Sequence, residues 1–414
     1  LVVEHDEDTI RRADHLIDLG PGAGTRGGRV VGQGSMADLI AAPESLTGRF
    51  LSKPLMHPIA ERRPVRRGDP ALGIEKASLH NLRKVHARIP LQRLTVVTGV
   101  SGSGKSTLAR DVLFANLSLR AGEKRRRGRA PGWVGCAGIS GVEQVTRVLE
   151  VDQTPIGRTP RSCPATYVGF WDEIRKLFAA ATEARVRGFG PSRFSFNTAG
   201  GRCDSCEGQG VQTIEMSFLP DVKVLCDACR GKRFNGETLA IEFRGRNIGD
   251  VLAMNVDDAV GFFTAHPRIH NALTLLQDVG LGYLTLGQQS PTLSGGEAQR
   301  IKLVTELARL RAGQGTLYVL DEPTVGLHMA DVEKLVRVLH RLVDAGNTVV
   351  VIEHNLDVMA EADWIVDLGP EGGSGGGRVV VQGSPEHVAK AFAKSHTASV
   401  LRPFLAERGR RSLD

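Results

Sequence analysis

A glycine-rich loop between an apolar run and a helical pattern constrains this sequence more than any other feature. The segment Gly99-Val-Ser-Gly-Ser-Gly-Lys105-Ser106 fits GxxxxGK[ST], with a β-branched run at 94–98 before it and helical spacing at 107–114 after it. In such a loop the glycines let backbone N–H groups turn toward phosphate oxygens, and the helix N-terminus adds a favourable dipole. We therefore expect a nucleotide-binding α/β fold, with phosphate contacts from Gly99, Ser101, Gly102, Ser103, Gly104, Lys105, Ser106 and Thr107.

Two carboxylates at the end of a later apolar run supply the chemistry that such a loop needs. We expect Lys105 to reach the β- and γ-phosphates of ATP and Ser106 to ligate Mg²⁺. The run 317–320 ends in Asp321-Glu322, and strands of an open α/β sheet carry such residues to its ligand edge. Asp321 is then expected to hold Mg²⁺ through water, and Glu322 to polarise the attacking water.

Three further positions complete this set. His354 follows the apolar run 348–352, where a γ-phosphate sensor is needed. The residues Ser294, Gly295 and Gly296 open a helical pattern and predict an anion site at its N-terminus. We call the segment 293–297 the signature. Gln153, between the phosphate loop and this signature, is a weaker candidate for a nucleotide contact. In this order the segments are those of an ATP-binding-cassette (ABC) ATPase, so we predict a P-loop cassette with a RecA-like mixed sheet, in which Glu322, His354 and Gln153 are catalytic.

Two cysteine pairs lie in the long insert between Gln153 and Ser294. The spacing Cys203-x2-Cys206-x19-Cys226-x2-Cys229 suits one tetrahedral Zn²⁺ held by four thiolates, and such a closed site is structural. The alternative, four unrelated buried cysteines, is disfavoured by that spacing. We therefore predict a helical signature domain that carries a zinc module at about 193–235.

Basic residues gather around the cysteines and favour a nucleic-acid partner. Any one of them alone is best explained as a solvated surface residue, but the set, with a net charge of +7 and a pI near 9.2, fits phosphate contacts. The run 124–129 is expected to be only a charged loop. The candidates for DNA contact are Arg158, Arg161, Arg193, Lys232 and Arg233.

Composition limits the remaining possibilities. No stretch approaches the ~20 apolar residues of a membrane span, which counts against a fused transporter. Six cysteines, four of them in the paired motif, disfavour a disulfide framework and indicate a reducing cytosol.

Residues 1–51 repeat the segment that begins at Val350. Val2-Val-Glu-His5 matches Val351-Ile-Glu-His354, and Asp18-Leu-Gly-Pro21 matches Asp367-Leu-Gly-Pro370. No phosphate loop, signature or Asp-Glu pair precedes His5, so we expect the C-terminal part of a tandem two-cassette protein. The expected parts are the end of a first cassette at 1–55, a linker at 56–70, the second cassette at 71–152 and 291–414, and the inserted signature domain at 153–290.

Taken together these segments resemble the UvrA family, the damage-sensing ATPases of bacterial nucleotide excision repair. The resemblance covers essentially the whole chain, and its most specific segments are 152–162, 200–210, 293–300 and 363–377. It implies a homodimer that uses ATP, Mg²⁺ and Zn²⁺, binds damaged double-stranded DNA, senses distortion rather than sequence, and passes the lesion to the helicase subunit UvrB. Such a protein is not itself a nuclease, because UvrC makes the cuts. Val325 and Cys163 stand where the family commonly has threonine and asparagine, which is compatible with a divergent paralogue.

Three other classes of protein are alternatives for this sequence. A UvrA-like self-resistance protein would remove an intercalating drug from DNA. A DNA-end ATPase of the Rad50 type shares the signature but needs long heptad repeats, which are absent. A cassette factor acting on ribosomes would have no use for the zinc pairs.

Overall fold

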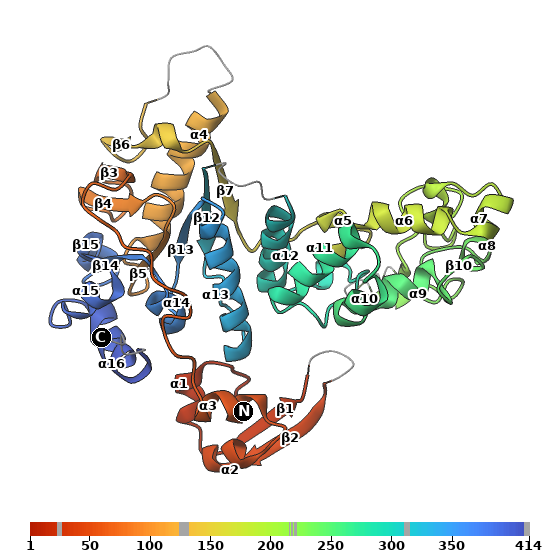
Figure 1. Ribbon diagram of the computed structural model, residues 1–414, viewed down its shortest axis with the longest axis horizontal. Helices are drawn as coiled ribbons and strands as arrows, with labels where there is room; N and C mark the ends of the chain where they lie inside the picture. The colour runs from red at the N-terminus through yellow and green to blue at the C-terminus, as the bar shows by residue number, and fades with distance from the viewer. Residues whose placement is uncertain are drawn as a thin grey trace. The chain divides into compact units, whose positions relative to one another are not determined.

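The computed structural model describes residues 1–22, 27–123, 132–214, 216, 218, 222–309 and 315–409 (Figure 1). The chain separates into two compact units, one formed by Leu1–Asp152 with Leu310–Asp414 and the other by Gln153–Arg309. The charged loop expected at 124–129 lies outside the described residues. None of the helices in the described ranges has the length and apolar character that a membrane crossing requires.

A six-stranded sheet forms the centre of the first unit. Its order is β15-β14-β5-β13-β12-β7, and only β15 runs antiparallel to its neighbour. The central strands are buried on both faces, which explains their continuous runs of apolar residues. The strands are β7 (Arg147–Val151), β12 (Thr316–Asp321), β13 (Thr348–Ile352), β5 (Leu94–Gly99), β14 (Trp364–Gly369) and β15 (Arg378–Gly383).

A smaller antiparallel sheet and several helices complete the cassette around this sheet. The small sheet has the order β4-β3-β6, and its apolar side chains share one core with β5 and the helix that follows the phosphate loop. The elements are β3 (Ala71–Ala77), β4 (Val85–Pro90), β6 (Gly138–Ser140), the π-helical η2 (Thr107–Phe114), η3 (Val142–Gln144), α4 (Ala115–Glu123), α13 (Met329–Asp344), α14 (Leu356–Ala360), η6 (Gly373–Gly375), α15 (Pro385–Ala389) and α16 (His396–Arg408).

The internal repeat seen in the sequence is also a structural repeat. Asp18 accepts hydrogen bonds from the hydroxyls of Ser45 and Thr47 at 2.6 and 2.9 Å. Asp367 accepts the corresponding bonds from Ser395 and Thr397, both at 2.6 Å. A register shift follows the aspartate in both hairpins. The N-terminal copy comprises α1 (Glu7–Arg11), β1 (Leu16–Gly20), β2 (Arg29–Gly34), α2 (Met36–Ala41) and α3 (Leu46–Ser52).

The two copies differ in what covers their strands. In the C-terminal copy β14 pairs with β5, and Val366 and Leu368 are 0% and 1% exposed. In the N-terminal copy β2 is the one partner of β1 among the described strands, and the matching Ile17 and Leu19 are 55% and 68% exposed.

The second unit is mainly helical and carries the signature and the cysteines. Its longest described helix, α12 (Gly295–Ala308), begins at the signature and belongs to this unit, whereas the expected boundary after residue 290 would place it in the second cassette. The other elements are α5 (Pro164–Val168), α6 (Trp171–Ala179), α7 (Thr182–Val186), η4 (Pro191–Phe194), β8 (Val211–Ile214), β9 (Val222–Leu225), α8 (Gly236–Leu239), β10 (Glu242–Phe243), β11 (Arg246–Asn247), α9 (Ile248–Ala253), α10 (Val256–Phe262), α11 (Pro267–Asp278) and η5 (Ser290–Thr292).

Candidate ATP site and candidate zinc centre

The phosphate loop connects β5 to η2, as its sequence predicts. Lys105 is 7% exposed, and its Nζ donates to the carbonyl oxygens of Gly99 and Val100, both at 3.0 Å. Burial lowers the pKa of Lys105, while the negative charges of Glu322, Asp321 and Asp367 act in the opposite direction. The loop thus holds a desolvated cation inside a turn of backbone groups, which is the arrangement that a polyphosphate requires.

Two serine hydroxyls of the phosphate loop differ in their exposure to solvent. Ser106 is exposed at the start of η2, and its hydroxyl does not cap that helix. Ser103 is buried, and its Oγ has no hydrogen-bond partner among the described residues. A buried hydroxyl without a partner is costly, so a phosphate oxygen within its reach would stabilise the loop.

A second glycine-rich segment, Gly372–Gly377, lies directly against the phosphate loop. The N–H of Gly373 donates to the carbonyl oxygen of Gly102 at 3.0 Å, and the N–H of Gly377 donates to that of Ser103 at 3.1 Å. A Cβ added at Gly372 would lie 2.5 Å from the carbonyl oxygen of Ser101. These glycines therefore allow a second backbone layer to brace the phosphate loop.

Asp321 ends β12 and forms an ion pair with an arginine of η2. Its Oδ2 lies 3.2 Å from NH1 of Arg110, whose Nε lies 2.5 Å from Oε1 of Glu150. Burial raises the pKa of Asp321; the Glu322 carboxylate also raises it, whereas Arg110 and Lys105 lower it. Arg110 thus partly offsets the repulsion between Asp321 and Glu322.

Glu322 and His354 come from neighbouring strands and meet at their carboxyl ends. Nε2 of His354 lies 3.3 Å from Oε1 of Glu322, and both side chains are about half exposed. The backbone of Glu322 has φ +44°, a left-handed conformation that costs a non-glycine residue about 1 kcal/mol or more. A hydrogen bond from its N–H to the carbonyl oxygen of Ile352, at 2.9 Å, holds this turn.

Glu353 organises the loops on both sides of this pair. The side chain is 2% exposed. Its Oε1 accepts from the N–H and the hydroxyl of Thr324 at 2.9 and 2.5 Å, and its Oε2 accepts from the N–H groups of His354 and Asn355 at 2.7 and 3.0 Å. One buried carboxylate therefore joins the turn after β12 to the turn after β13.

The signature forms a helix cap, as its sequence predicts. The Ser294 hydroxyl accepts from the N–H of Glu297 at 3.2 Å, and the Ser294 N–H donates to Oε2 of Glu297 at 2.7 Å. A Cβ added at Gly295 would lie 3.1 Å from both Cβ and Oε1 of Gln153. The second unit therefore brings Gln153 onto the start of the signature helix, while Lys105, Asp321, Glu322 and His354 belong to the first unit.

The four cysteines of the insert converge in the second unit. Their sulfur atoms all lie within 4.8 Å of one another, with 3.9 Å between Cys203 and Cys226 and 3.6 Å between Cys206 and Cys229. Tetrahedral zinc with Zn–S bonds of about 2.3 Å places its sulfurs about 3.8 Å apart. Burial raises the pKa of Cys229 to about 12. Zinc, which stabilises thiolates, fits this buried donor set.

The basic residues expected at a DNA surface lie in several environments. Arg158 is exposed, and the guanidinium of Arg161 lies 3.0 Å from Glu207. Lys232 Nζ lies 3.0 Å from Asp250. Arg193 pairs with Glu237 at 2.5 Å and stacks on Phe189.

Arg233 contradicts the prediction of a DNA contact. It is 3% exposed, its guanidinium donates to the carbonyl oxygen of Gly287 at 2.7 Å, and its CZ lies 5.1 Å from the ring centre of Phe196. Its carbonyl oxygen accepts from the N–H of Cys203 at 2.9 Å. Arg233 thus supports the cysteine cluster from within, and no sequence pattern distinguishes it from its surface neighbours.

Known proteins similar to this chain were found by sequence and by structure. No protein-family model matches the chain. UvrABC system protein A of Thermus thermophilus is 57% identical over 390 residues, which are 94% of this chain and 40% of that protein. The same protein of Haemophilus influenzae is 54% identical over 405 residues, or 98% and 42% of the two chains. The crystal structure of UvrA2 from Deinococcus radiodurans has a TM-score of 0.85 at 49% identity and covers 97% of this chain and 47% of that one.

The chain spans about two fifths of the length of the curated relatives that it matches. Within that part, the cassette sheet, the phosphate loop and the four-cysteine cluster all occur together. The chain is therefore a UvrA homologue that corresponds to part of UvrABC system protein A and has the fold of an ABC ATPase.

Proposed function

We propose that this chain is the ATP-hydrolysing part of a protein that recognises damaged DNA in nucleotide excision repair. The observation that carries the proposal is the 57% identity to UvrABC system protein A over 94% of the chain. The position of Glu322 beside His354, with Lys105 in the same unit, supports it. The protein would use ATP to load a UvrB-type helicase subunit, act as a UvrA-type homodimer in the cytoplasm, and make no cut itself.

The proposed ATP chemistry of this chain uses residues of the first unit. Phosphates would be bound by backbone N–H groups of the phosphate loop and by Lys105 in place of the carbonyl oxygens that it now contacts. Ser106 and Asp321 would hold Mg²⁺, which neutralises developing charge on the phosphates. Glu322 would orient the attacking water, and His354, 3.3 Å away, would contact the γ-phosphate. We also propose Gln153, Ser294, Gly295 and Gly296 as nucleotide contacts, the signature residues meeting the phosphate loop of another cassette.

The zinc centre would have a structural role. Cys203, Cys206, Cys226 and Cys229 leave no open position for catalysis when they hold zinc together. Its function would be to fix the surface that carries Arg158, Arg161, Arg193 and Lys232, which we propose as DNA contacts.

Binding to duplexes with and without a bulky lesion, over a range of salt concentrations, tests the DNA role. Removing one phosphate contact lowers the salt slope by about one, so we expect this from Arg158→Ala but not from Arg268→Ala, an exposed arginine of α11 outside the module. Binding that is independent of salt, or equal for damaged and undamaged DNA, would contradict the proposal. Complementation of an excision-deficient strain under ultraviolet light, with the gene that encodes the chain, tests the repair role.

A self-resistance protein that removes an intercalating drug from DNA is the second candidate. The likeness to a structure named UvrA2, together with Val325 and Cys163, is the observation that favours a paralogue. Protection of cells against an intercalator without protection against ultraviolet light would favour this function. A DNA-end ATPase is disfavoured, since the described helices include none longer than the 16 residues of α13.

A further inference from the structure

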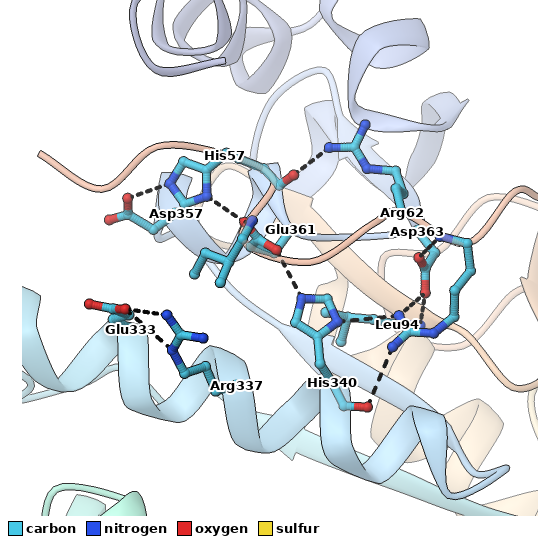
Figure 2. Close-up of polar contacts among 12 residues, drawn as sticks. His57, Arg62, Leu94, Glu333, Arg337, His340, Asp357, Glu361 and Asp363 are labelled. Atoms are coloured by element: carbon cyan, nitrogen blue, oxygen red, sulfur yellow. Dashed lines mark hydrogen bonds and ion pairs between the residues drawn. The ribbon is translucent and has the colours of Figure 1, made fainter. Parts of the chain in front are cut away.

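A buried imidazole ties the segment before the cassette to the helix that follows His354 (Figure 2). His57 is 0% exposed; its Nδ1 lies 2.6 Å from Oε1 of Glu361, and its Nε2 lies 2.8 Å from Oδ1 of Asp357. Asp357 is in the first turn of α14, and Glu361 follows its last residue. Two carboxylates one helical turn apart therefore bracket a single ring.

Hydrogen-bond chemistry fixes the protons in this network. Carboxylates only accept, so both ring nitrogens of His57 donate and the ring is an imidazolium. His340 Nε2 lies 2.9 Å from Oε2 of Glu361, and its Nδ1 lies 3.2 Å from a guanidinium nitrogen of Arg63. Because a guanidinium only donates, His340 accepts at Nδ1 and is neutral. The positive charge that joins Asp357 to Glu361 is thus on His57.

Arg408 brings a second buried cation to the same helix. It is 7% exposed; its NH1 lies 3.8 Å from Oδ1 of Asp357, and its NH2 lies 2.5 Å from Oε1 of Glu7 in α1. Its carbonyl oxygen accepts from the N–H of His57 at 2.8 Å. In the internal repeat α1 is the counterpart of α14, since Asp6 caps one and Asn355 caps the other. Arg408 therefore links the two helices that follow His5 and His354.

The start of α14 is joined to the residues expected to act on ATP. Oδ1 of Asn355 accepts from the N–H groups of Asp357 and Val358 at 3.0 and 3.2 Å, and the N–H of Asn355 donates to Glu353. His354 is the residue between Glu353 and Asn355, and a displacement of α14 would move it relative to Glu322. A cavity of about 560 Å³ borders this region, lined by residues 4–8, Glu322, His354, Asp357 and Arg408, among others.

We propose that His57 and Arg408 are positioning residues for ATP hydrolysis. They fix α14, hold His354 against Glu322, and thereby couple residues 1–57 to the ATP site. Both act through α14, since His57 is fully buried and the guanidinium of Arg408 is held by Glu7 and Asp357. The catalytic half of this inference rests on the proposed ATPase function, whereas the attachment of α14 does not.

Hydrogen exchange of the 414-residue chain tests the attachment without any nucleotide. His57→Gln keeps a polar side chain but cannot donate to both carboxylates as a cation. Loss of a charge-assisted hydrogen bond should speed exchange at residues 353–361 about tenfold or more. Arg93→Gln is the matched control: Arg93 donates to the carbonyl oxygen of Pro64 at 2.8 Å, so it also holds the linker, but it has no contact with α14 in the hydrogen bonds described. Unchanged exchange in His57→Gln, or equal acceleration in both variants, would overturn the proposal.

ATP kinetics test the catalytic half. Misplacement of His354 should lower kcat about tenfold in His57→Gln with KM nearly unchanged, because the phosphate loop is intact. His57→Gln and Arg408→Gln should be non-additive, since both act on Asp357. A loss of thermal stability with kcat unchanged would reduce both residues to structural ones. If wild-type turnover does not depend on Lys105 and Glu322, the ATPase assignment fails, and the exchange experiment still decides the attachment of α14.

Discussion

Nε2 of His354 lies 3.3 Å from Oε1 of Glu322, across the carboxyl ends of the neighbouring strands β13 and β12. This contact places the expected γ-phosphate sensor beside the carboxylate that we propose to orient the attacking water.

Glu322→Gln should preserve ATP binding and remove hydrolysis. The amide keeps the size of the side chain but not the charge that polarises water, and loss of a general base costs about a hundredfold or more in turnover. Nucleotide affinity and phosphate release, measured on the same preparation, check the two parts. Hydrolysis at the wild-type rate would exclude Glu322 as the base.

Lys105→Ala should weaken ATP binding itself. Lys105 is buried, and removal of a buried charge that pairs with a ligand typically costs about 2–5 kcal/mol, or thirtyfold and more in affinity. Titration with a fluorescent ATP analogue measures this loss. The exposed Lys84→Ala serves as a control that leaves affinity unchanged, and equal affinities for all three proteins would remove Lys105 from the site.

Gly372→Ala should lower nucleotide affinity although residue 372 lies outside the phosphate loop. Its methyl group would come within 2.5 Å of the carbonyl oxygen of Ser101 and push the bracing segment away from the loop. Ser374→Ala, in the same segment, adds no such contact and should bind ATP normally. Equal affinity in both variants would show that the loop keeps its shape without the brace.

Cys206→Ser should abolish binding of one zinc ion per chain and destabilise the zinc module. Zinc binding is coupled to local folding, so proteolysis should become faster at about residues 193–235 while ATP binding persists. Cys136→Ser, outside the cluster, is the control. Metal analysis that finds no zinc in the wild-type protein would refute the assignment.

Stability should depend on pH through the network of His57. Burial opposes its charge, but hydrogen bonds and charges of Asp357 and Glu361 raise the pKa of His57 above its ordinary 6.5. The stabilisation that His57 contributes to the free energy of unfolding is therefore complete below pH 6.5, and it is lost as pH rises through the folded-state pKa. Glu361 is also buried, yet His340, His57 and the Ile59 N–H lower its pKa to about 2, so its contribution is lost as pH falls from 4.5 toward 2.

Unfolding free energies of the wild type and of His57→Gln, measured across this range, test both signs. Arg408, Arg63 and His340 also face the network and stay the same in both proteins. The difference between the two proteins should shrink as pH rises above the folded-state pKa of His57. A difference that grows with pH would contradict the imidazolium.

The features that the sequence predicted are those encoded over a few neighbouring residues. The phosphate loop, the cap at Ser294 and the two cysteine pairs each follow from local spacing, and the structure has all three. The ion pair of Arg110 with Asp321 spans 211 residues, and the contact of His57 with Glu361 spans 304. Such contacts depend on strand order, which periodicity does not determine. Arg233 shows the same limit, because its burial is set by packing against Phe196 and Gly287.

The uncovered strand β1 has a consequence for handling the protein. Ile17 and Leu19 expose apolar side chains on one face of β1, and the strand's edge lacks the pairing that β5 gives to its repeat counterpart β14 among the described residues. Open, apolar strand edges promote self-association and aggregation. The apparent molar mass from light scattering should therefore rise with protein concentration, and charged residues at 17 and 19 should reduce that rise.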